Sequence, residues 1–213
     1  MQKKITVEIW SDVMCPFCYI GKRRFEAALE QFAERDQVEV IWRSFQLDPN
    51  LKTDPDKSVA QSLAEKKGWS AEQTAQSMAY VGNMARTVGL EYHFDKAVVA
   101  NSFDAHRFTH YAKSLGKQDA AEERLFAAYF TEGKNTADHT TLARLGAEIG
   151  LDSAAVRQAL AGDDFAEDVK SDIALANQFG ITGVPFFVFN RQYAVSGAQD
   201  VQVFLQTLQK SAE

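Results

Sequence analysis

Two cysteines separated by two residues are the part of the sequence with the clearest chemistry. Cys15 and Cys18 flank Pro16 and Phe17, and the 213-residue chain has no other cysteine. Two thiols at this spacing can form and break a disulfide, and the species that attacks is a thiolate. The pair therefore predicts thiol–disulfide chemistry.

The elements around the pair place Cys15 at the start of a helix. Residues 5–10 alternate β-branched or aromatic residues with the polar Glu8, which predicts a largely buried strand. Residues 21–32 carry apolar side chains three and four apart, which predicts an amphipathic helix. Unpaired N–H groups and the helix dipole favour an anion at that position. We therefore expect Cys15 to be an exposed nucleophile whose pKa lies below the ordinary value of about 8.5.

The neighbouring residues divide the roles of the two sulfurs. Pro16 suits the first helical turn because its missing N–H needs no partner there. Cys18 lies within that turn, and we expect it to face inward as the buried, resolving thiol. Phe17 adds no charge between the sulfurs. We therefore expect this protein to be a weaker oxidant than the strongest thiol–disulfide oxidants, whose reduction potentials are about −120 mV. Asp12, just before the helix, is interpreted as a turn or capping residue.

A second informative segment lies near the C-terminus. Gly180 is typical of a helix C-terminus, and Val184 and Pro185 then lead into the apolar run 186–189, which predicts a strand. Proline is tolerated at the first residue of a strand because it cannot donate to the ladder. Composition alone favours a trans bond before this proline, since only about 5–6% of such bonds are cis in folded proteins.

Taken in order, these segments resemble the FrnE-like branch of the DsbA family. The resemblance runs from the first strand to the last helix, through residues 11–22, 42–50, 101 with 105–107, 183–187 and 196–199. It implies a thioredoxin fold interrupted by a helical domain, and thiol–disulfide exchange as the activity. It also implies that Cys15 attacks, that Cys18 is its partner, and that Pro185 is a cis proline facing the pair. The backbone of Val184 would then pair with substrate.

The pattern of the whole chain predicts an α/β fold, with a thioredoxin-like core interrupted by an all-helical insertion domain. We assign residues 1–57 and 181–213 to the core and residues 58–180 to the insertion, where no proline occurs. Residues 38–45 alternate as a second strand does. Serines at 58 and 70, each followed three residues later by glutamine, have the capping-box spacing that begins a helix.

Composition and charge exclude several partners. The chain is 46% hydrophobic, enough to bury a full core, and its net charge of −6 argues against nucleic acid or an anionic membrane. No apolar run approaches the roughly 20 residues of a membrane helix. The first predicted strand follows residues 1–4 directly, leaving no signal peptide, so we expect a cytoplasmic protein. There, a cysteine pair is more often catalytic, redox-sensing or metal-binding than structural.

The expected partners are disulfide-containing peptides or proteins, or glutathione as a co-substrate. We expect no bound cofactor or metal, and a cytoplasmic setting favours reductase or isomerase work over net oxidation. Two further residues carry open alternatives. In thioredoxin-like proteins an acid at the place of Glu8 can relay a proton to the buried sulfur; the alternative is an edge or surface carboxylate. His106 is either a substrate contact or an ordinary half-exposed or core histidine.

Other functions use the same residues differently. His106 and His110 share a helix face, and with both cysteines they supply four zinc ligands. The intervening loop is, however, far longer than the roughly 12–15 residues of a zinc finger. Glutathione-dependent hydroxychromene-carboxylate isomerases and kappa-class transferases share the helical insertion and the proline, but typically have serine where this chain has a cysteine pair. Two inert core thiols and a redox sensor that only switches conformation complete the alternatives.

Overall fold

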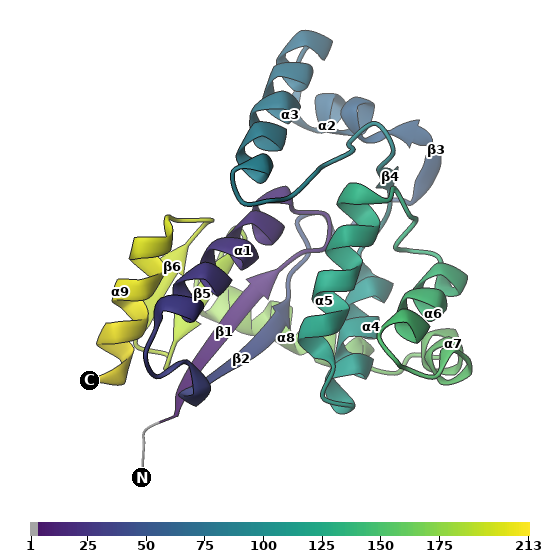
Figure 1. Cartoon of the computed structure of the whole chain (residues 1–213). Coiled ribbons are helices and arrows are strands. Elements are labelled where there is room, and N and C mark those ends of the chain that lie inside the picture. Colours follow the sequence, from purple (N-terminus) through teal and green to yellow (C-terminus); the bar gives the residue numbers. More distant parts are fainter. Residues whose placement is uncertain (1–3) are drawn as a thin grey trace. The chain divides into compact units, whose positions relative to one another are not determined.

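The computed structural model describes residues 4–213, which form two compact units (Figure 1). The first unit comprises residues 4–47 and 170–213, and the second comprises residues 48–169. The elements of the first unit, in chain order, are β1 (Ile5–Ser11), α1 (Pro16–Gln31), the 3-10 turn η1 (Arg35–Gln37), β2 (Val38–Ser44), most of α8 (Ala166–Gln178), β5 (Phe186–Phe189), β6 (Tyr193–Ser196) and α9 (Val201–Ala212).

The first unit is built on a four-stranded mixed sheet in the order β2-β1-β5-β6. β1 and β2 run parallel, with Ile5 opposite Val38, and α1 connects them, as a parallel pair requires. β5 runs antiparallel to β1, with Trp10 opposite Phe186, and β6 is antiparallel to β5. This is the predicted thioredoxin-like arrangement.

Successive side chains of β5 point to opposite faces of the sheet, and both faces are covered by helices. Phe187 and Phe189 point towards α1 and α9, and the ring of Phe25 in α1 lies 5.6 and 6.2 Å from them. Phe204 of α9 completes this aromatic cluster, 4.6 Å from Phe187. Val188 points the other way, into a cluster with Trp10, Ala176 and Ile181. Figure 1 shows the corresponding layers, with α1 and α9 on one side of the sheet and α8 on the other.

The boundaries of the core differ from the predicted ones. They lie at 47/48 and 169/170 instead of 57/58 and 180/181, so most of α8 belongs to the sheet unit. Hydrogen bonds explain the difference: Trp10 Nε1 donates to the carbonyl of Asp172 at 3.0 Å, and the Asp172 carboxylate accepts from Ser44 N at 3.0 Å. An amphipathic helix pattern predicts that one face of the helix is buried, but not which element covers that face. The sequence pattern therefore assigned this helix to the insertion and not to the core.

The second unit is mainly helical, but the prediction of an all-helical insertion is wrong in one detail. A short antiparallel ribbon pairs β3 (Asp54–Ser58) with β4 (Val98–Val99). Both predicted capping boxes are present: Gln61 N donates to Ser58 Oγ and Gln73 N to Ser70 Oγ, each at 3.1 Å. The helical elements are α2 (Val59–Lys67), α3 (Ala71–Arg86), α4 (Phe103–Ser114), α5 (Gln118–Phe126), the π-helical turn η2 (Ala127–Thr131), α6 (His139–Glu148) and α7 (Ser153–Ala161).

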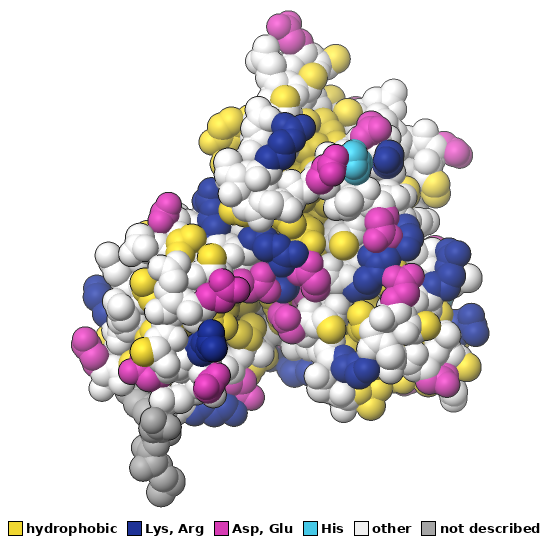
Figure 2. Space-filling view, viewed as in Figure 1, with side chains coloured by type: hydrophobic (Ala, Val, Ile, Leu, Met, Phe, Trp, Pro, Cys, Tyr) yellow, Lys and Arg dark blue, Asp and Glu magenta, His cyan; other side chains and the backbone are white. Residues whose placement is uncertain are grey.

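Figure 2 shows acidic and basic side chains interspersed over the visible face of the molecule. Within residues 4–213, no helix combines the length and the apolar character needed to cross a bilayer.

Candidate active site

The cysteine pair lies at the junction between β1 and α1. Cys15 is the N-cap of α1, with φ −88° and ψ 110°, and Pro16 occupies the first turn. The backbone N–H of Cys15 donates to the carbonyl of Asp12 at 3.0 Å, and that of Cys18 donates to the carbonyl of Cys15 at 3.0 Å. The prediction that Cys15 begins the helix is therefore confirmed, and the helix N-terminus favours negative charge at this sulfur.

The prediction that Cys15 is exposed is wrong for this state of the molecule. Both cysteines are free thiols, and Cys15 and Cys18 are only 2% and 1% exposed. The reason is a contact far along the sequence: the Cys15 thiol donates to the carbonyl oxygen of Val184, with Sγ and O 3.4 Å apart. That bond turns the sulfur towards β5 instead of towards water.

The surroundings of Cys18 keep this thiol protonated. Burial raises the pKa of Cys18 well above its ordinary value, and the hydrogen bond with Cys15 and a negative charge on Cys15 raise it further. The Asp12 backbone and the Ser11 hydroxyl act in the opposite direction, but they do not outweigh these effects. Of the two thiols, Cys18 is thus in the environment predicted for an inward-facing sulfur.

The predicted proline segment meets the cysteine pair. The peptide bond between Val184 and Pro185 is cis. The Val184 carbonyl accepts from Cys15, and the Pro185 carbonyl accepts from Gly197 N at 2.8 Å. β5 begins directly after the proline and pairs with the end of β1 that leads to Cys15, so sheet register brings together two segments that lie 169 residues apart.

Two residues beside the pair differ in what they offer. Phe17, between the cysteines, is 37% exposed and presents an apolar ring at the surface. Asp12 is buried, and its Oδ2 accepts from the backbone N–H of Leu47 at 2.7 Å. Asp12 was predicted to be a turn or capping residue; its carboxylate also anchors the chain after β2 beside the cysteine loop.

Glu8 is a buried carboxylate held by two arginines and not a surface carboxylate. It is 2% exposed, and its oxygens accept from Arg43 Nη2 at 2.7 Å and from Arg191 Nε at 2.8 Å. Burial acts to raise the pKa of Glu8, but hydrogen bonds and charge from Arg191 and Arg43 outweigh it, so the pKa lies below its ordinary value. Arg43 also pairs with Asp172 at 2.8 Å. We call Glu8, Arg43, Asp172 and Arg191 the Glu8 cluster.

The side chains of the Glu8 cluster hold structure together. The cluster connects β1, β2, α8 and the turn between β5 and β6, all within the first unit. Glu8 follows the alternation of β1, so it lies on the same face of the strand as Trp10, which packs towards α8. No local pattern indicates Arg43 and Arg191 as partners, because they lie 35 and 183 residues from Glu8.

The histidines lie in the second unit. His106 is in α4 and is 1% exposed. Its burial corresponds to the alternative of a core histidine. Among residues 4–213, the His, Cys, Asp and Glu side chains form no group of three or more that could hold a metal ion.

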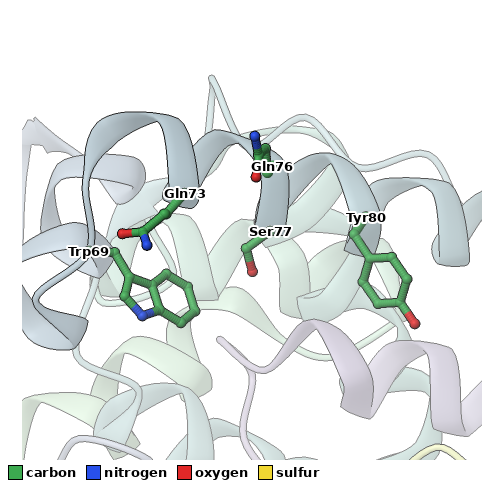
Figure 3. Close-up of a pocket in the computed structure, with 5 residues that line it drawn as sticks. All are labelled: Trp69, Gln73, Gln76, Ser77 and Tyr80. Carbon is green, nitrogen blue, oxygen red and sulfur yellow. The ribbon is translucent and has the colours of Figure 1, made fainter.

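The second unit has an open hollow of about 400 Å³ along α3 (Figure 3). Trp69 lies at one end and Tyr80 at the other, with Gln73, Gln76 and Ser77 between them. The lining is uncharged, and the Gln73 side-chain oxygen is already engaged by Ser70 N at 2.9 Å. No sequence pattern predicts this hollow, because the exposure of Trp69 and Tyr80 is visible only in the folded structure.

The comparisons with known proteins agree over the length of the chain. The family model for the DSBA-like thioredoxin domain matches residues 6–209. A probable DsbA oxidoreductase from Streptomyces coelicolor superposes with a TM-score of 0.91 at 41% identity, covering 97% of this chain and 89% of that one. The uncharacterized protein YwbO of Bacillus subtilis is 29% identical over 202 residues, 94% of each chain.

A more distant structure shares the fold. The cytosolic disulfide reductase DsbM from Pseudomonas aeruginosa, solved with GSH, superposes with a TM-score of 0.66 at 20% identity, covering 97% of this chain and 95% of that one. Together with the helix-capping cysteine and the proline segment packed against it, the match over residues 6–209 establishes the relationship. The chain belongs to the family of DSBA-like thioredoxin domains.

Proposed function

We propose that this protein is a thiol–disulfide oxidoreductase that exchanges electrons with its substrate through Cys15 and Cys18. The observation that carries the proposal is the pair itself. Two free thiols lie at the N-terminus of α1, and the Cys15 thiol is hydrogen-bonded to the carbonyl of Val184, the residue before Pro185. Family membership supports the same chemistry.

The reaction transfers two electrons in two exchange steps. The Cys15 thiolate attacks one sulfur of a substrate disulfide, forming a mixed disulfide and releasing the other substrate sulfur as a thiolate. Cys18 then loses its proton and attacks the Cys15 sulfur, which forms the Cys15–Cys18 disulfide and releases the second substrate thiolate. The pair is oxidised and the substrate reduced; the reverse sequence oxidises a substrate dithiol.

The environment of Cys18 suits the order of these steps. A negative charge on Cys15 is one of the causes that raise the pKa of Cys18. Once Cys15 is joined to substrate it carries no charge, so this contribution disappears when Cys18 must ionise. Cys18 therefore stays protonated while Cys15 attacks, and it becomes easier to ionise in the mixed disulfide.

Substrate binding would release Cys15 from its buried position. The Val184 carbonyl accepts the thiol at 3.4 Å in the dithiol form. An extended polypeptide that adds to this segment donates a backbone N–H to the same carbonyl, and so takes the acceptor away from the thiol. Recognition through backbone groups gives wide tolerance of side chains.

We favour the reductase or isomerase direction, in the cytoplasm, with disulfide-containing peptides or proteins as substrates and glutathione as electron donor. Thiols are kept reduced in that compartment. DsbM, a cytosolic disulfide reductase solved with GSH, shares this fold, and this choice follows its description. No nucleic-acid, membrane, metal or cofactor partner is part of the proposal.

Insulin reduction with glutathione as donor tests the proposal. We expect the native protein to accelerate the reaction, and Cys15→Ser to abolish the acceleration. A glutathione-dependent isomerase or transferase gives the opposite pattern: no insulin reduction, and activity on a small aromatic substrate that survives Cys18→Ala. A redox sensor would form a reversible Cys15–Cys18 bond and show no turnover with either glutathione or dithiothreitol.

A further inference from the structure

Helix α1 touches the proline segment at a glycine. Gly21 lies one turn after Cys18 and is buried. A Cβ atom placed on it would lie 2.9 Å from Pro185 Cγ and 3.4 Å from Phe187 Cζ. Carbon atoms do not approach within 3.0 Å without something moving, and the nearest atom belongs to a proline ring, which is not the free end of a flexible side chain. Glycine is therefore the residue that fits here.

The proline has little room to retreat from this contact. The Pro185 carbonyl accepts from Gly197 N at 2.8 Å. The carbonyl of Ala198, which follows Gly197, accepts from Arg24 Nη1 at 2.6 Å. Arg24 belongs to the same helix as Gly21, so α1, the proline segment and the turn at 197–198 are tied to one another. A side chain at position 21 would displace either Pro185 or α1, by about 0.5 Å if an ordinary carbon–carbon contact is to be restored.

We propose that Gly21 is a positioning residue for thiol–disulfide exchange. Its missing side chain lets Pro185 lie against α1, and this keeps the Val184 carbonyl within reach of the Cys15 sulfur. The inference rests on the proposed function, because it concerns the reactive state of the same pair. Glycine in a helix interior is unfavourable relative to alanine, so a close approach gives a physical reason for its presence.

The displacement has a predicted redox signature. The bond from the Cys15 thiol to Val184 exists only in the dithiol, since a disulfide sulfur has no hydrogen to donate. Weakening it in Gly21→Ala destabilises the dithiol relative to the disulfide. We expect the equilibrium with glutathione to move towards the disulfide about 2- to 5-fold, as the loss of one weak hydrogen bond gives. The reduction potential of the cysteine pair should therefore fall by about 9–21 mV, since a tenfold change in the equilibrium constant corresponds to 29.6 mV.

A matched control separates this effect from that of an alanine in a helix. Gly82 lies in α3, and a Cβ atom there has no heavy atom within 4 Å. Gly82→Ala should leave the glutathione equilibrium of the pair unchanged. Pro185→Ala supplies the second control because alanine lacks Cγ: in that background, Gly21→Ala should no longer shift the equilibrium.

The outcomes distinguish this inference from the proposed function. If the native pair does not equilibrate with glutathione, the proposed function fails. If the native pair equilibrates and folded Gly21→Ala has the same constant, the positioning role is refuted. An equal shift with and without the proline ring also refutes it. Should Gly21→Ala not fold alone, the proposal requires it to fold in the Pro185→Ala background without changing the equilibrium there; failure to fold there too places the clash elsewhere and overturns the inference.

Discussion

Replacing Glu8 with glutamine removes the carboxylate that two arginines share inside the first unit. Arg43 Nε and Nη2 reach Glu8 Oε1 at 3.1 and 2.7 Å, and Arg191 reaches both oxygens at 2.8 and 3.0 Å. The amide keeps one oxygen acceptor but turns its NH2 donors towards guanidinium donors. Arg43 keeps its ion pair with Asp172 in this variant, so its guanidinium does not become an unpaired buried charge.

The burial of each partner sets the size of the effect. Glu8 and Arg43 have side chains that are 3% and 20% exposed, so losing their charged hydrogen bonds should cost about 1.5–3 kcal/mol. The Arg191 side chain is 56% exposed, and solvent screening limits its contribution to about 0–1 kcal/mol. We therefore expect Glu8→Gln to lower the free energy of unfolding by about 2–4 kcal/mol, and Arg191→Gln to lower it by less than about 1 kcal/mol.

The loss should depend on pH in a defined direction. The pKa of Glu8 in the folded protein is below its ordinary value of 4.5, so the carboxylate contributes stability that is fully present above about pH 4.5. That contribution disappears as the pH falls through the lowered pKa. The difference in stability between the native protein and Glu8→Gln should therefore be constant near neutral pH and shrink in acid.

Urea unfolding followed by tryptophan fluorescence measures this difference in the first unit. Trp10 and Trp42 are buried in that unit, while Trp69 belongs to the other, so a Trp69→Phe background restricts the signal to the sheet. In parallel, the pH–rate profile of thiol–disulfide exchange should be unchanged in Glu8→Gln. Unchanged stability together with a displaced pH–rate profile would refute the structural role and restore the proton relay.

Three further substitutions test other parts of the structure. Cys18→Ser should trap substrate or glutathione on Cys15 as a mixed disulfide, detected by mass spectrometry of the intact protein; a variant that forms no adduct with either would contradict the assignment. Asp12→Ala removes the acceptor of the Leu47 N–H and should cost about 1–3 kcal/mol in urea unfolding; an unchanged midpoint would show that water replaces the bond. Arg107→Lys loses a guanidinium that donates to the carbonyls of Ala159, Leu160, Gly162 and Asp164, and should destabilise the helical unit by about 2–4 kcal/mol, read by Trp69 fluorescence; the reasoning fails if the lysine variant unfolds like the native protein.

Local sequence signals predicted the parts of the site that depend on neighbours along the chain. The apolar strand before the pair and the spaced apolar residues after it place Cys15 at a helix N-cap, and the structure has it there. The two serine–glutamine capping boxes are local in the same way, because three residues contain both partners. The resemblance to the DsbA family supplied the overall fold; its assignment to the FrnE-like branch stays a prediction.

Contacts between distant residues account for what the sequence did not predict. The burial of Cys15 depends on Val184, 169 residues away, and no pattern near the cysteine indicates that acceptor. Glu8 reads as an isolated acid in a strand, because Arg43 and Arg191 become its neighbours only when the sheet forms. Gly21 was predicted on the buried stripe of α1, but the reason for a glycine there became visible only with Pro185 against it.

The central claim is that Cys15 and Cys18 exchange a pair of electrons with disulfides. Equilibrating the reduced protein across a series of reduced-to-oxidised glutathione ratios, followed by acid quenching, alkylation and mass spectrometry, tests this claim most directly. The account predicts one two-electron transition in which both thiols become unavailable together and the protein loses two hydrogens. Thiols that stay alkylatable at every ratio, or a glutathione adduct that persists without a bond between the two cysteines, would contradict it.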